Sequence, residues 1–245
     1  MAFDPNIIRL YVHADLAADA SLQLTRDQAH YLGTVMRRKA GDEVYLFNGR
    51  DGEWRCSIRH LDRKKGVLRV DELSLEQVNT RPLTLLFAPL KRSAIDFVVQ
   101  KATELGVTNL QPVLTERTTT RRVNADRMEA ISLEAAEQCE RLDLPVTHEP
   151  VELGALLHEE LSDRKIIFCD EGDDVPPMMQ ALEGHEAGGQ WSILIGPEGG
   201  FTAAERALLR GMNNVVAVGI GPRILRADTA AVAAMTLYQA ALGDF

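Results

Sequence analysis

The sequence predicts an α/β fold in which a parallel sheet covered by helices follows a small β-barrel domain. Up to about residue 75, short runs of alternating apolar and polar residues are typical of strands with one exposed face. From Arg81 on, short unbroken apolar runs alternate with helical segments, which indicates parallel strands buried on both faces. A polar segment over 76–82 ends in proline and separates the two patterns, so we expect domains over 1–76 and 80–245.

The first domain is expected to be a barrel that carries one helix. Its expected strands are "SLQLT", "EVYLFNG", "EWRCSIRHL" and "GVLRVDELS", with the turn signals "NGRDGE" and "DRKKG" between the last three. The segment 25–41 has helical spacing of its apolar residues, with Thr25 as a plausible N-cap and Gly41 beyond the helix end.

The second domain is expected to contain five strands and five helices. The apolar runs that predict strands are "LTLLFAP", "NLQPVLT", "KIIFCD", "WSILIG" and "NVVAVGIG". Helices are expected over 93–105, 126–142, 153–161, 203–211 and 227–242. This pattern alone predicts an ordinary doubly wound sheet, because knotted chains are nearly absent from proteins.

Length and composition favour a soluble cytoplasmic protein. The chain has 245 residues, of which 45% are apolar, and no stretch approaches the 18 consecutive apolar residues of a membrane span. Its first residues lack the basic region and apolar run of a signal peptide. The cysteines at 56, 139 and 169 have no paired spacing for zinc or for a disulfide framework. We therefore expect no metal site and no membrane contact.

The charge is unevenly distributed. The formal net charge is −9, yet residues 1–79 hold 12 basic and 12 acidic residues, whereas residues 149–186 hold 11 acids and two bases. Short basic clusters occur at Arg37-Arg38-Lys39, Arg63-Lys64-Lys65, Lys91-Arg92, and Arg117 with Arg121-Arg122. A single cluster is more often a solvated face, but four of them favour an anionic ligand.

Two glycine-containing loops follow predicted strands of the second domain. The first covers 196–201 in "SILIGPEGGFTAAE", where Thr202 and Glu205 have the spacing of a capping box at a helix start. The second covers 219–226 in "GIGPRILRADTA", before the last helix. Ligands of parallel sheets bind at the carboxyl ends of the strands, so these loops predict a binding site.

Two familiar nucleotide sites do not fit these loops. A Walker-type phosphate loop requires a lysine followed by serine or threonine after its last glycine, and "GPEGGFT" has neither. The segment "GIGPRI" is a partial dinucleotide motif with Ile224 at the third glycine and no acidic residue about 20 positions later. Tight structural turns remain the alternative for either loop taken alone.

Four motifs in order resemble one known family. "LLFAPLKRSAIDFVVQKATELGV", "AAEQCERLDLP", "LIGPEGGFTAAE" and "GIGPRILRADTAAVAAM" are similar to those of the RsmE-type 16S ribosomal RNA uridine-N3 methyltransferases, and the resemblance covers essentially the whole chain. It implies a PUA-like RNA-binding barrel and a SPOUT domain whose C-terminal end forms a trefoil knot. It also implies S-adenosylmethionine as methyl donor, 16S ribosomal RNA of the small subunit as partner, and a homodimer.

The resemblance also implies where the cofactor binds. Glycines would let backbone groups approach the adenosine, and apolar side chains would supply walls. The residues carried over from the family motifs are Leu90, Gly196, Pro197, Glu198, Gly199, Gly200, Ile220, Gly221, Leu225, Arg226 and Ala227. Two positions depart from the family pattern: Asp228 stands where glutamate is usual, and Glu140 where a small residue, often glycine, is usual. Aspartate is one methylene shorter than glutamate, so it fits a role at 228 that requires a long side chain less well. An aspartate could still cap the start of the last helix.

Methylation of a uracil N3 requires removal of its proton or stabilisation of the resulting anion. Arg226 is the expected electrostatic stabiliser, since a guanidinium fork suits the planar O2-N3-O4 edge. Glu198 and Asp228 are candidate bases or orienting groups, and their alternative roles are to close the glycine turn and to cap the last helix.

RNA contacts are expected from basic side chains. N3 lies on the Watson-Crick edge, so the target uridine must be unpaired or splayed out. The expected phosphate ligands are Arg9, Arg37, Arg38, Lys39, Lys91, Arg92, Arg117, Arg121, Arg122 and Arg141. On the expected helix 126–142, Glu134, Gln138 and Arg141 share one face, which is either a substrate or dimer surface or simply an exposed face.

Two other functions remain open at this stage. The chain could be an RNA-binding or ribosome-assembly module whose cavity is not catalytic. A nicotinamide-linked oxidoreductase on a doubly wound sheet is disfavoured, because the acidic residue that would bind the ribose is missing.

Overall fold

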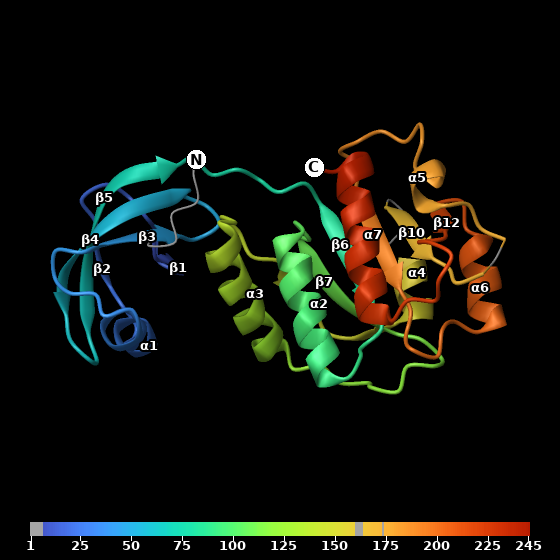
Figure 1. Cartoon of the computed structure of the whole chain (residues 1–245), viewed down its shortest axis with the longest axis horizontal. Helices are drawn as coiled ribbons and strands as arrows, with labels where there is room; N and C mark the ends of the chain where they lie inside the picture. The colour runs from blue at the N-terminus through green and yellow to red at the C-terminus, as the bar shows by residue number, and fades with distance from the viewer. Residues whose placement is uncertain (1–6, 160–163, 173) are drawn as a thin grey trace. The chain divides into compact units, whose positions relative to one another are not determined.

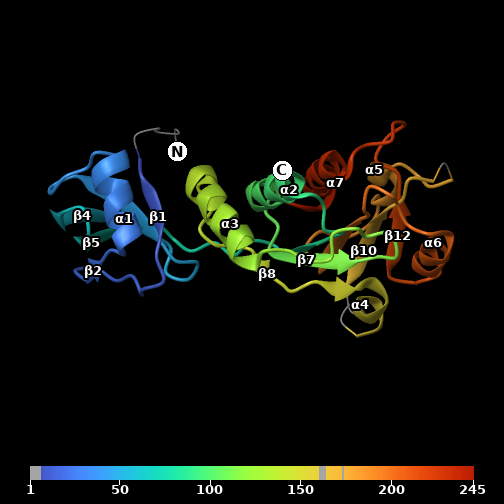
Figure 2. The same ribbon diagram turned by 90° about the horizontal axis from the view of Figure 1, so that it is seen from below.

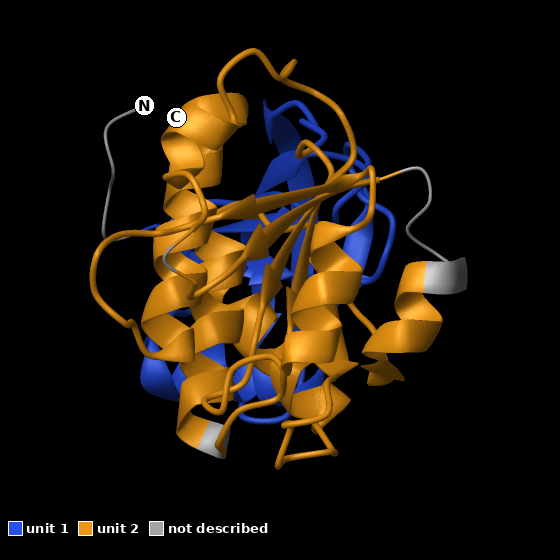
Figure 3. Ribbon diagram, turned by 90° about the vertical axis from the view of Figure 1, so that its right-hand side faces the viewer, with its two compact units in different colours: residues 1–79, 136–144 blue, residues 80–135, 145–245 orange. Residues whose placement is uncertain are grey.

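The computed structural model describes residues 7–159, 164–172 and 174–245, which form two compact units. The first unit comprises residues 1–79 and 136–144, and the second comprises 80–135 and 145–245 (Figure 3). The inclusion of 136–144 in the first unit was not indicated by the sequence. Within the described ranges, no helix combines the length and apolar character needed to cross a membrane.

The first unit is built on a five-stranded sheet with the order β1-β3-β4-β5-β2. Its strands are β1 (Arg9–Tyr11), β2 (Ser21–Gln23), β3 (Glu43–Phe47), β4 (Glu53–Leu61) and β5 (Gly66–Leu75). The four strands expected from alternating residues are confirmed, and β1 is an addition of three residues. Pairing is antiparallel except between β1 and β3.

One helical segment covers the core of this sheet. It begins as α1 (Arg26–His30), whose N-cap Thr25 is confirmed and forms a capping box with Gln28. The chain then continues as one π-helical turn, η1 (Tyr31–Val35). The helical segment thus ends earlier than expected, because the sequence pattern placed Gly41 just beyond its end. Leu32 lies fully buried in the cluster formed by the inward side chains of the strands.

A buried ion pair holds residues 136–144 within the first unit. The Arg9 guanidinium lies 2.5 Å from the Glu53 carboxylate, and the two side chains are only 4% and 6% exposed. Arg9 also donates to the carbonyl oxygen of Ala136 at 3.1 Å and lies over the ring of Phe47. This burial argues against the phosphate contact expected for Arg9, because its hydrogen-bonding groups are directed to protein atoms.

The second unit contains a sheet in which every recorded pairing is parallel. Its main strand order is β12-β10-β11-β6-β7-β8, and β9 pairs with β7. The strands are β6 (Leu83–Phe87), β7 (Asn109–Leu114), β8 (Val146–Thr147), β9 (Val151–Glu152), β10 (Lys165–Cys169), β11 (Trp191–Ile195) and β12 (Val215–Val218). All five expected strands are present, and the short strands β8 and β9 are additions.

Helices cover both faces of this sheet, as expected. They are α2 (Arg92–Glu104), α3 (Ala125–Cys139), α4 (Leu153–Glu159), α5 (Met178–Ala181), α6 (Ala203–Arg210) and α7 (Ala227–Leu242). One core cluster joins α2, α5 and α7 to inward residues such as Ile193, and another joins α4 and α6 to residues such as Leu194. Ile193 and Leu194 are successive residues of β11, so their side chains point to opposite faces of the sheet. Figures 1 and 2 show α2 and α7 side by side on one face, with α4 on the other.

The strand order departs from simple succession at two places. β11 lies between β10 and β6, although β10 precedes it in the chain, and β12 then pairs with the outer side of β10. From this outer strand the chain returns to pack α7 against α2 and β11. This return is consistent with the C-terminal knot that the family resemblance implies.

The end of α3 explains one departure from the family pattern. The helix ends at Cys139, and Glu140 has a φ of 64°, in the left-handed region. Only glycine adopts this conformation without a steric cost, which accounts for the small residue that the family usually has there. Arg141 lies beyond the helix, so the expected face shared by Glu134, Gln138 and Arg141 is corrected: only the first two are on α3.

We expect Glu140→Gly to raise the free energy of unfolding by about 1 kcal/mol, because it relieves the left-handed strain. The matched control is Glu129→Gly at an exposed position inside α3, which should lower that free energy by about 1 kcal/mol. Urea denaturation followed by circular dichroism measures both. Destabilisation of similar size in the two variants would contradict the explanation.

Candidate functional site

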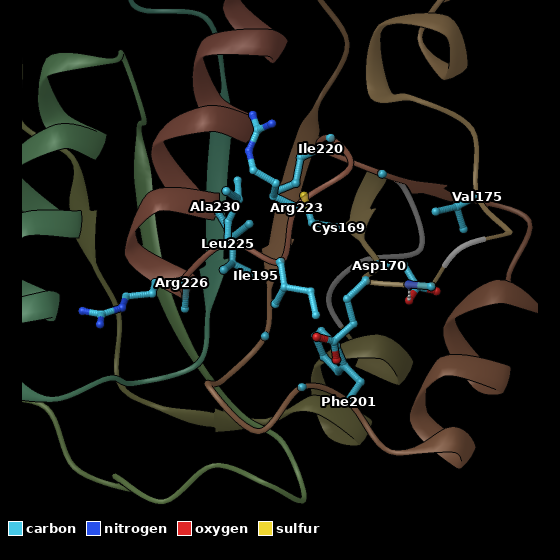
Figure 4. Close-up of a pocket in the computed structure, with 18 of the residues that line it drawn as sticks. Cys169, Asp170, Val175, Ile195, Phe201, Ile220, Arg223, Leu225, Arg226 and Ala230 are labelled. Carbon is cyan, nitrogen blue, oxygen red and sulfur yellow. Dashed lines mark hydrogen bonds between the residues drawn. The ribbon is translucent and has the colours of Figure 1, made fainter.

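A cavity of about 650 Å³ opens at the carboxyl ends of β10, β11 and β12. Three loops surround it, one after each strand, and Figure 4 shows residues from all three facing the same space. This size lies within the range that holds a small ligand or cofactor. The lining residues are Cys169, Asp170, Glu171, Gly172, Val175, Pro177, Ile195, Gly196, Pro197, Glu198, Gly200, Phe201, Gly219, Ile220, Gly221, Pro222, Arg223, Ile224, Leu225, Arg226, Ala227 and Ala230.

The loop after β11 needs glycine at two positions. A Cβ on Gly196 would approach the Phe201 ring to 2.5 Å, and that ring is itself packed edge-on against Phe168. Gly200 has a φ of 65°, and a Cβ there would overlap the Glu171 carboxylate. Its amide donates to the carbonyl oxygen of Pro197 at 2.9 Å and closes the turn. A backbone bond thus closes the turn, with no need for the Glu198 side chain.

The carboxylate of Glu205 fixes the end of this loop. The predicted capping box is confirmed: Oε2 of Glu205 accepts from the Thr202 amide at 2.8 Å, and Oγ1 of Thr202 accepts from the Glu205 amide at 3.2 Å. The other oxygen, Oε1, accepts from the amide of Glu116 at 2.9 Å. Glu205 is only 8% exposed, so it joins the start of α6 to the loop after β7 with little competition from water.

Arg117, which follows Glu116 in the loop after β7, supports the same glycine loop. Its guanidinium donates to the carbonyl oxygen of Gly199 at 2.8 Å. The side chain is exposed, but the structure gives it a positioning role that the sequence did not suggest. Gly199 itself does not line the cavity, although it belongs to the loop that does.

The loops after β10 and β12 are tied to each other. The Gly219 amide donates to the carbonyl oxygen of Pro176 at 2.8 Å, and the Met178 amide donates to the carbonyl oxygen of Gly219 at 2.9 Å. Ile220 and Leu225 supply apolar wall, as expected, and Ile224 also lines the cavity but is 89% exposed. These backbone bonds join the two loops directly, and both loops line the cavity.

The loop after β10 is the part of the site that the sequence analysis missed. The buried Asp170 carboxylate lies 2.9 Å from Arg206 and 2.7 Å from Arg210, both of which project from α6. Burial raises the pKa of the Cys169 thiol to about 12, so it lines the cavity as a neutral thiol at pH 7. One sequence signal could have predicted this loop: the expected strand "KIIFCD" ends at the same sheet edge as the two strands that precede the glycine loops.

Most of the residues carried over as cofactor ligands line this cavity together. They are Gly196, Pro197, Glu198, Gly200, Ile220, Gly221, Leu225, Arg226 and Ala227. Leu90 is not among them, because it lines a separate cavity between the loops after β6 and β7. Leu90 nevertheless shares a core cluster with Ile195 and Ile220, which line the glycine cavity.

Of the three candidate catalytic residues, Arg226 and Glu198 line the cavity, and Asp228 does not. Arg226 occupies the N-cap position of α7 without a side-chain cap, and Figure 4 shows its exposed side chain extending away from the other labelled residues. Asp228 lies in the first turn of α7 and accepts a hydrogen bond from the Thr229 amide, so it is not the N-cap. Glu198 is exposed. The side chains of Arg226 and Glu198 are thus free to contact a ligand that extends out of the cavity.

The expected phosphate ligands fall into distinct environments. Arg141 is 8% exposed and pairs with Asp143, and Arg121 pairs with Glu152. In the first unit, Arg37 and Lys39 are exposed and Arg38 is partly buried. In the second unit, Lys91 and Arg122 are exposed, while the side chain of Arg92 lies outside the described residues.

Asp174 titrates as part of the loop after β10. The hydrogen-bonded Arg210 guanidinium, 2.6 Å away, lowers the pKa of Asp174 to about 2. Because the folded-state pKa lies below the usual value, this pair stabilises the fold above about pH 4, and its contribution disappears as the pH falls through 2.

We expect Arg210→Met to raise the pKa of Asp174 towards its ordinary value of 3.8, since the guanidinium is removed. Carbon-detected NMR titration of the Asp174 carboxyl group measures the shift. Arg206→Met is the control, because it leaves the Arg210 contact with Asp174 in place. An unchanged pKa in Arg210→Met would contradict this assignment.

Comparison with known proteins assigns both units to recognised domains. An RNA methyltransferase domain matches residues 77–239, and an RNA methyltransferase PUA domain matches residues 24–71. The chain is 31% identical over 228 residues to the ribosomal RNA small subunit methyltransferase E of Rickettsia conorii, covering 93% of each chain. It is 32% identical over 239 residues to the enzyme of the same name from Synechocystis sp., covering 96% of this chain and 78% of that one.

Solved structures extend the similarity to the whole fold. The ribosomal RNA small subunit methyltransferase E of Neisseria gonorrhoeae, bound to S-adenosyl methionine, has a TM-score of 0.87 at 26% identity and covers 98% of this chain and 99% of its own. A Legionella pneumophila protein in complex with the same cofactor has a TM-score of 0.85 at 29% identity, with the same coverage. The resemblance stated from the sequence motifs is therefore confirmed: the chain belongs to the family of RNA methyltransferases that includes ribosomal RNA small subunit methyltransferase E.

Proposed function

We propose that this protein transfers a methyl group from S-adenosylmethionine to N3 of a uridine in 16S ribosomal RNA of the small subunit. The observation that carries the proposal is the glycine-lined cavity at the carboxyl ends of β10, β11 and β12. It occurs on a fold whose relatives from Neisseria gonorrhoeae and Legionella pneumophila bind that cofactor. Family membership supports RNA as the class of substrate.

The cavity fits the donor. A cofactor of this kind has an adenosine that requires close backbone approach and apolar contact, and it has no triphosphate to neutralise. Gly196 and Gly200 keep the space free where a Cβ would displace Phe201 or overlap Glu171. Ile195, Ile220 and Leu225 provide apolar wall, and the loop carries no lysine of the kind that a phosphate loop requires.

Bound S-adenosylmethionine supplies a methyl group already activated by the positive sulfur. The protein then has to align the uracil N3 with that methyl group, and positioning of this kind lowers a barrier by roughly 7–11 kcal/mol. We assign Arg226 to the O2-N3-O4 edge, where its guanidinium stabilises the charge that develops as N3 loses its proton. Glu198 and Asp228 are the candidate acceptors of that proton. Glu198 is the better placed of the two, because Asp228 already accepts a hydrogen bond from its neighbour Thr229.

The remaining parts of the proposal concern the partners. The domain over 1–76 binds RNA as a PUA-like module, and the domain over 80–245 carries the chemistry. Exposed basic residues such as Arg37, Lys39 and Lys91 contact phosphates around an unpaired target uridine. We further propose that the enzyme acts in the cytoplasm as a homodimer, as the family resemblance implies.

Incubation of small ribosomal subunits that lack the modification with labelled S-adenosylmethionine tests the proposal. Nucleoside mass spectrometry of the recovered 16S RNA should detect 3-methyluridine. Label at another position would refute the proposed target atom. Calorimetric binding of the cofactor with no label in RNA would favour a non-catalytic RNA-binding or assembly module.

We expect Arg226→Ala to abolish methyl transfer while S-adenosylmethionine still binds. The physical reason is that the exposed guanidinium extends away from the other lining residues and acts on the acceptor, whereas those other residues hold the donor. Single-turnover rates and isothermal titration calorimetry separate these effects. Lys165→Ala removes a cation at the amino end of β10 and is the control. Full activity of Arg226→Ala would remove Arg226 from the mechanism.

We expect Gly196→Ala to weaken binding of S-adenosylmethionine by at least about tenfold, a loss of about 1.4 kcal/mol. The new methyl group would collide with the Phe201 ring, which cannot retreat because it packs against Phe168. Gly154→Ala is the matched control, since a Cβ there meets nothing within 4 Å. Equal affinities of the two variants would show that the loop tolerates a side chain.

A further inference from the structure

A second cavity lies in the second unit, between the loops after β6 and β7 and the helices that follow them. Its volume is about 310 Å³, less than half that of the glycine-lined cavity, and the two cavities share no lining residue. The lining residues are Leu90, Ile95, Asp96, Thr120, Arg122, Val123, Asn124, Arg127 and Met128. A space of this size lies at the lower end of the range for small-ligand sites, which suits a single base.

The floor of this cavity is apolar and fixed. Leu90, Ile95 and Met128 are each at most 8% exposed and belong to the main core cluster of the unit, and Val123 packs against the same cluster. Side chains held in this way present an apolar surface that does not rearrange. A nucleobase can pack on such a surface through van der Waals contact, which requires contact area and little hydrogen bonding.

The rim combines one ion pair with a further exposed cation. The Asp96 carboxylate accepts two hydrogen bonds from the Arg127 guanidinium, at 2.7 and 2.5 Å, so these two charges neutralise each other. Arg122 is exposed, and across the described residues no carboxylate lies within ion-pair distance of it. The rim therefore carries a net positive charge, whereas the whole chain carries −9.

This cavity lies at the same edge of the sheet as the proposed donor site. The Ala88 amide donates to the carbonyl oxygen of Ile195 at 3.0 Å, so the segment that leads to Leu90 runs beside the one that leads to Gly196. β6 and β11 are paired parallel strands, which lie about 4.8 Å apart. A polynucleotide that brings one base to the donor cavity would therefore carry neighbouring nucleotides past the second cavity.

We propose that the second cavity binds one nucleotide that flanks the target uridine in the RNA chain. Its base packs on the floor formed by Leu90, Ile95 and Met128, and its phosphate pairs with Arg122. This inference rests on the proposed function, since it takes the substrate to be RNA. It adds a subsite that fixes the direction in which the RNA strand crosses the carboxyl edge of the sheet.

Steady-state methylation of unmodified small subunits by Arg122→Ala tests the subsite. KM for the subunits should rise about tenfold, with kcat and the Kd of S-adenosylmethionine within about twofold of wild type. The slope of log Kd against log salt concentration, measured by fluorescence anisotropy with a labelled single-stranded oligoribonucleotide from the target region, should fall by about 1. Lys165→Ala, at the opposite edge of the sheet, should change neither quantity.

A second variant separates the apolar floor from the charge. Val123→Phe fills the cavity without removing a cation, so it should raise KM for the subunits by a similar factor and leave the salt slope unchanged. Wild-type KM in both variants would overturn the subsite. If the wild-type enzyme transfers no label to RNA, the proposed function fails instead. The anisotropy measurement then decides the subsite independently, because it requires no methyl transfer.

Discussion

The second unit depends on the placement of β11 between β10 and β6. This order brings the loop after β11 to the middle of the sheet edge, with the loop after β10 on one side and the loop after β6 on the other. Because all three strands are parallel, their loops leave the sheet at the same edge. Because β10 and β11 are neighbours, Asp170 and Gly196 face one cavity.

The glycine loop gains its rigidity from groups outside itself. Glu205 accepts hydrogen bonds from Thr202 and from the Glu116 amide, and Arg117 donates to the Gly199 carbonyl. Adjacent residues of the loop after β7 thus hold the glycine loop at two points. A preorganised loop pays less ordering entropy when a ligand binds, which gives these polar contacts a functional consequence.

Basic residues that look alike in the sequence have different roles in the structure. Arg9 pairs with Glu53 in the core of the first unit, Arg117 positions a loop, and Arg122 lies exposed at the rim of a cavity. Their charges are the same, but burial and partners differ. A pattern of cations therefore indicates an anionic ligand only after the cations with structural partners have been identified.

The sequence by itself determined the parallel sheet, the helices on both faces, the Thr202–Glu205 capping box and the family, because these depend on local periodicity and short motifs. Only the tertiary structure decided that Asp170 and Glu171 line the glycine cavity, that Leu90 lines another, and that Glu140 adopts a left-handed conformation. Such facts depend on which strands become neighbours and where a helix ends. Strand neighbours are set by contacts between residues far apart in the chain, which local patterns do not encode.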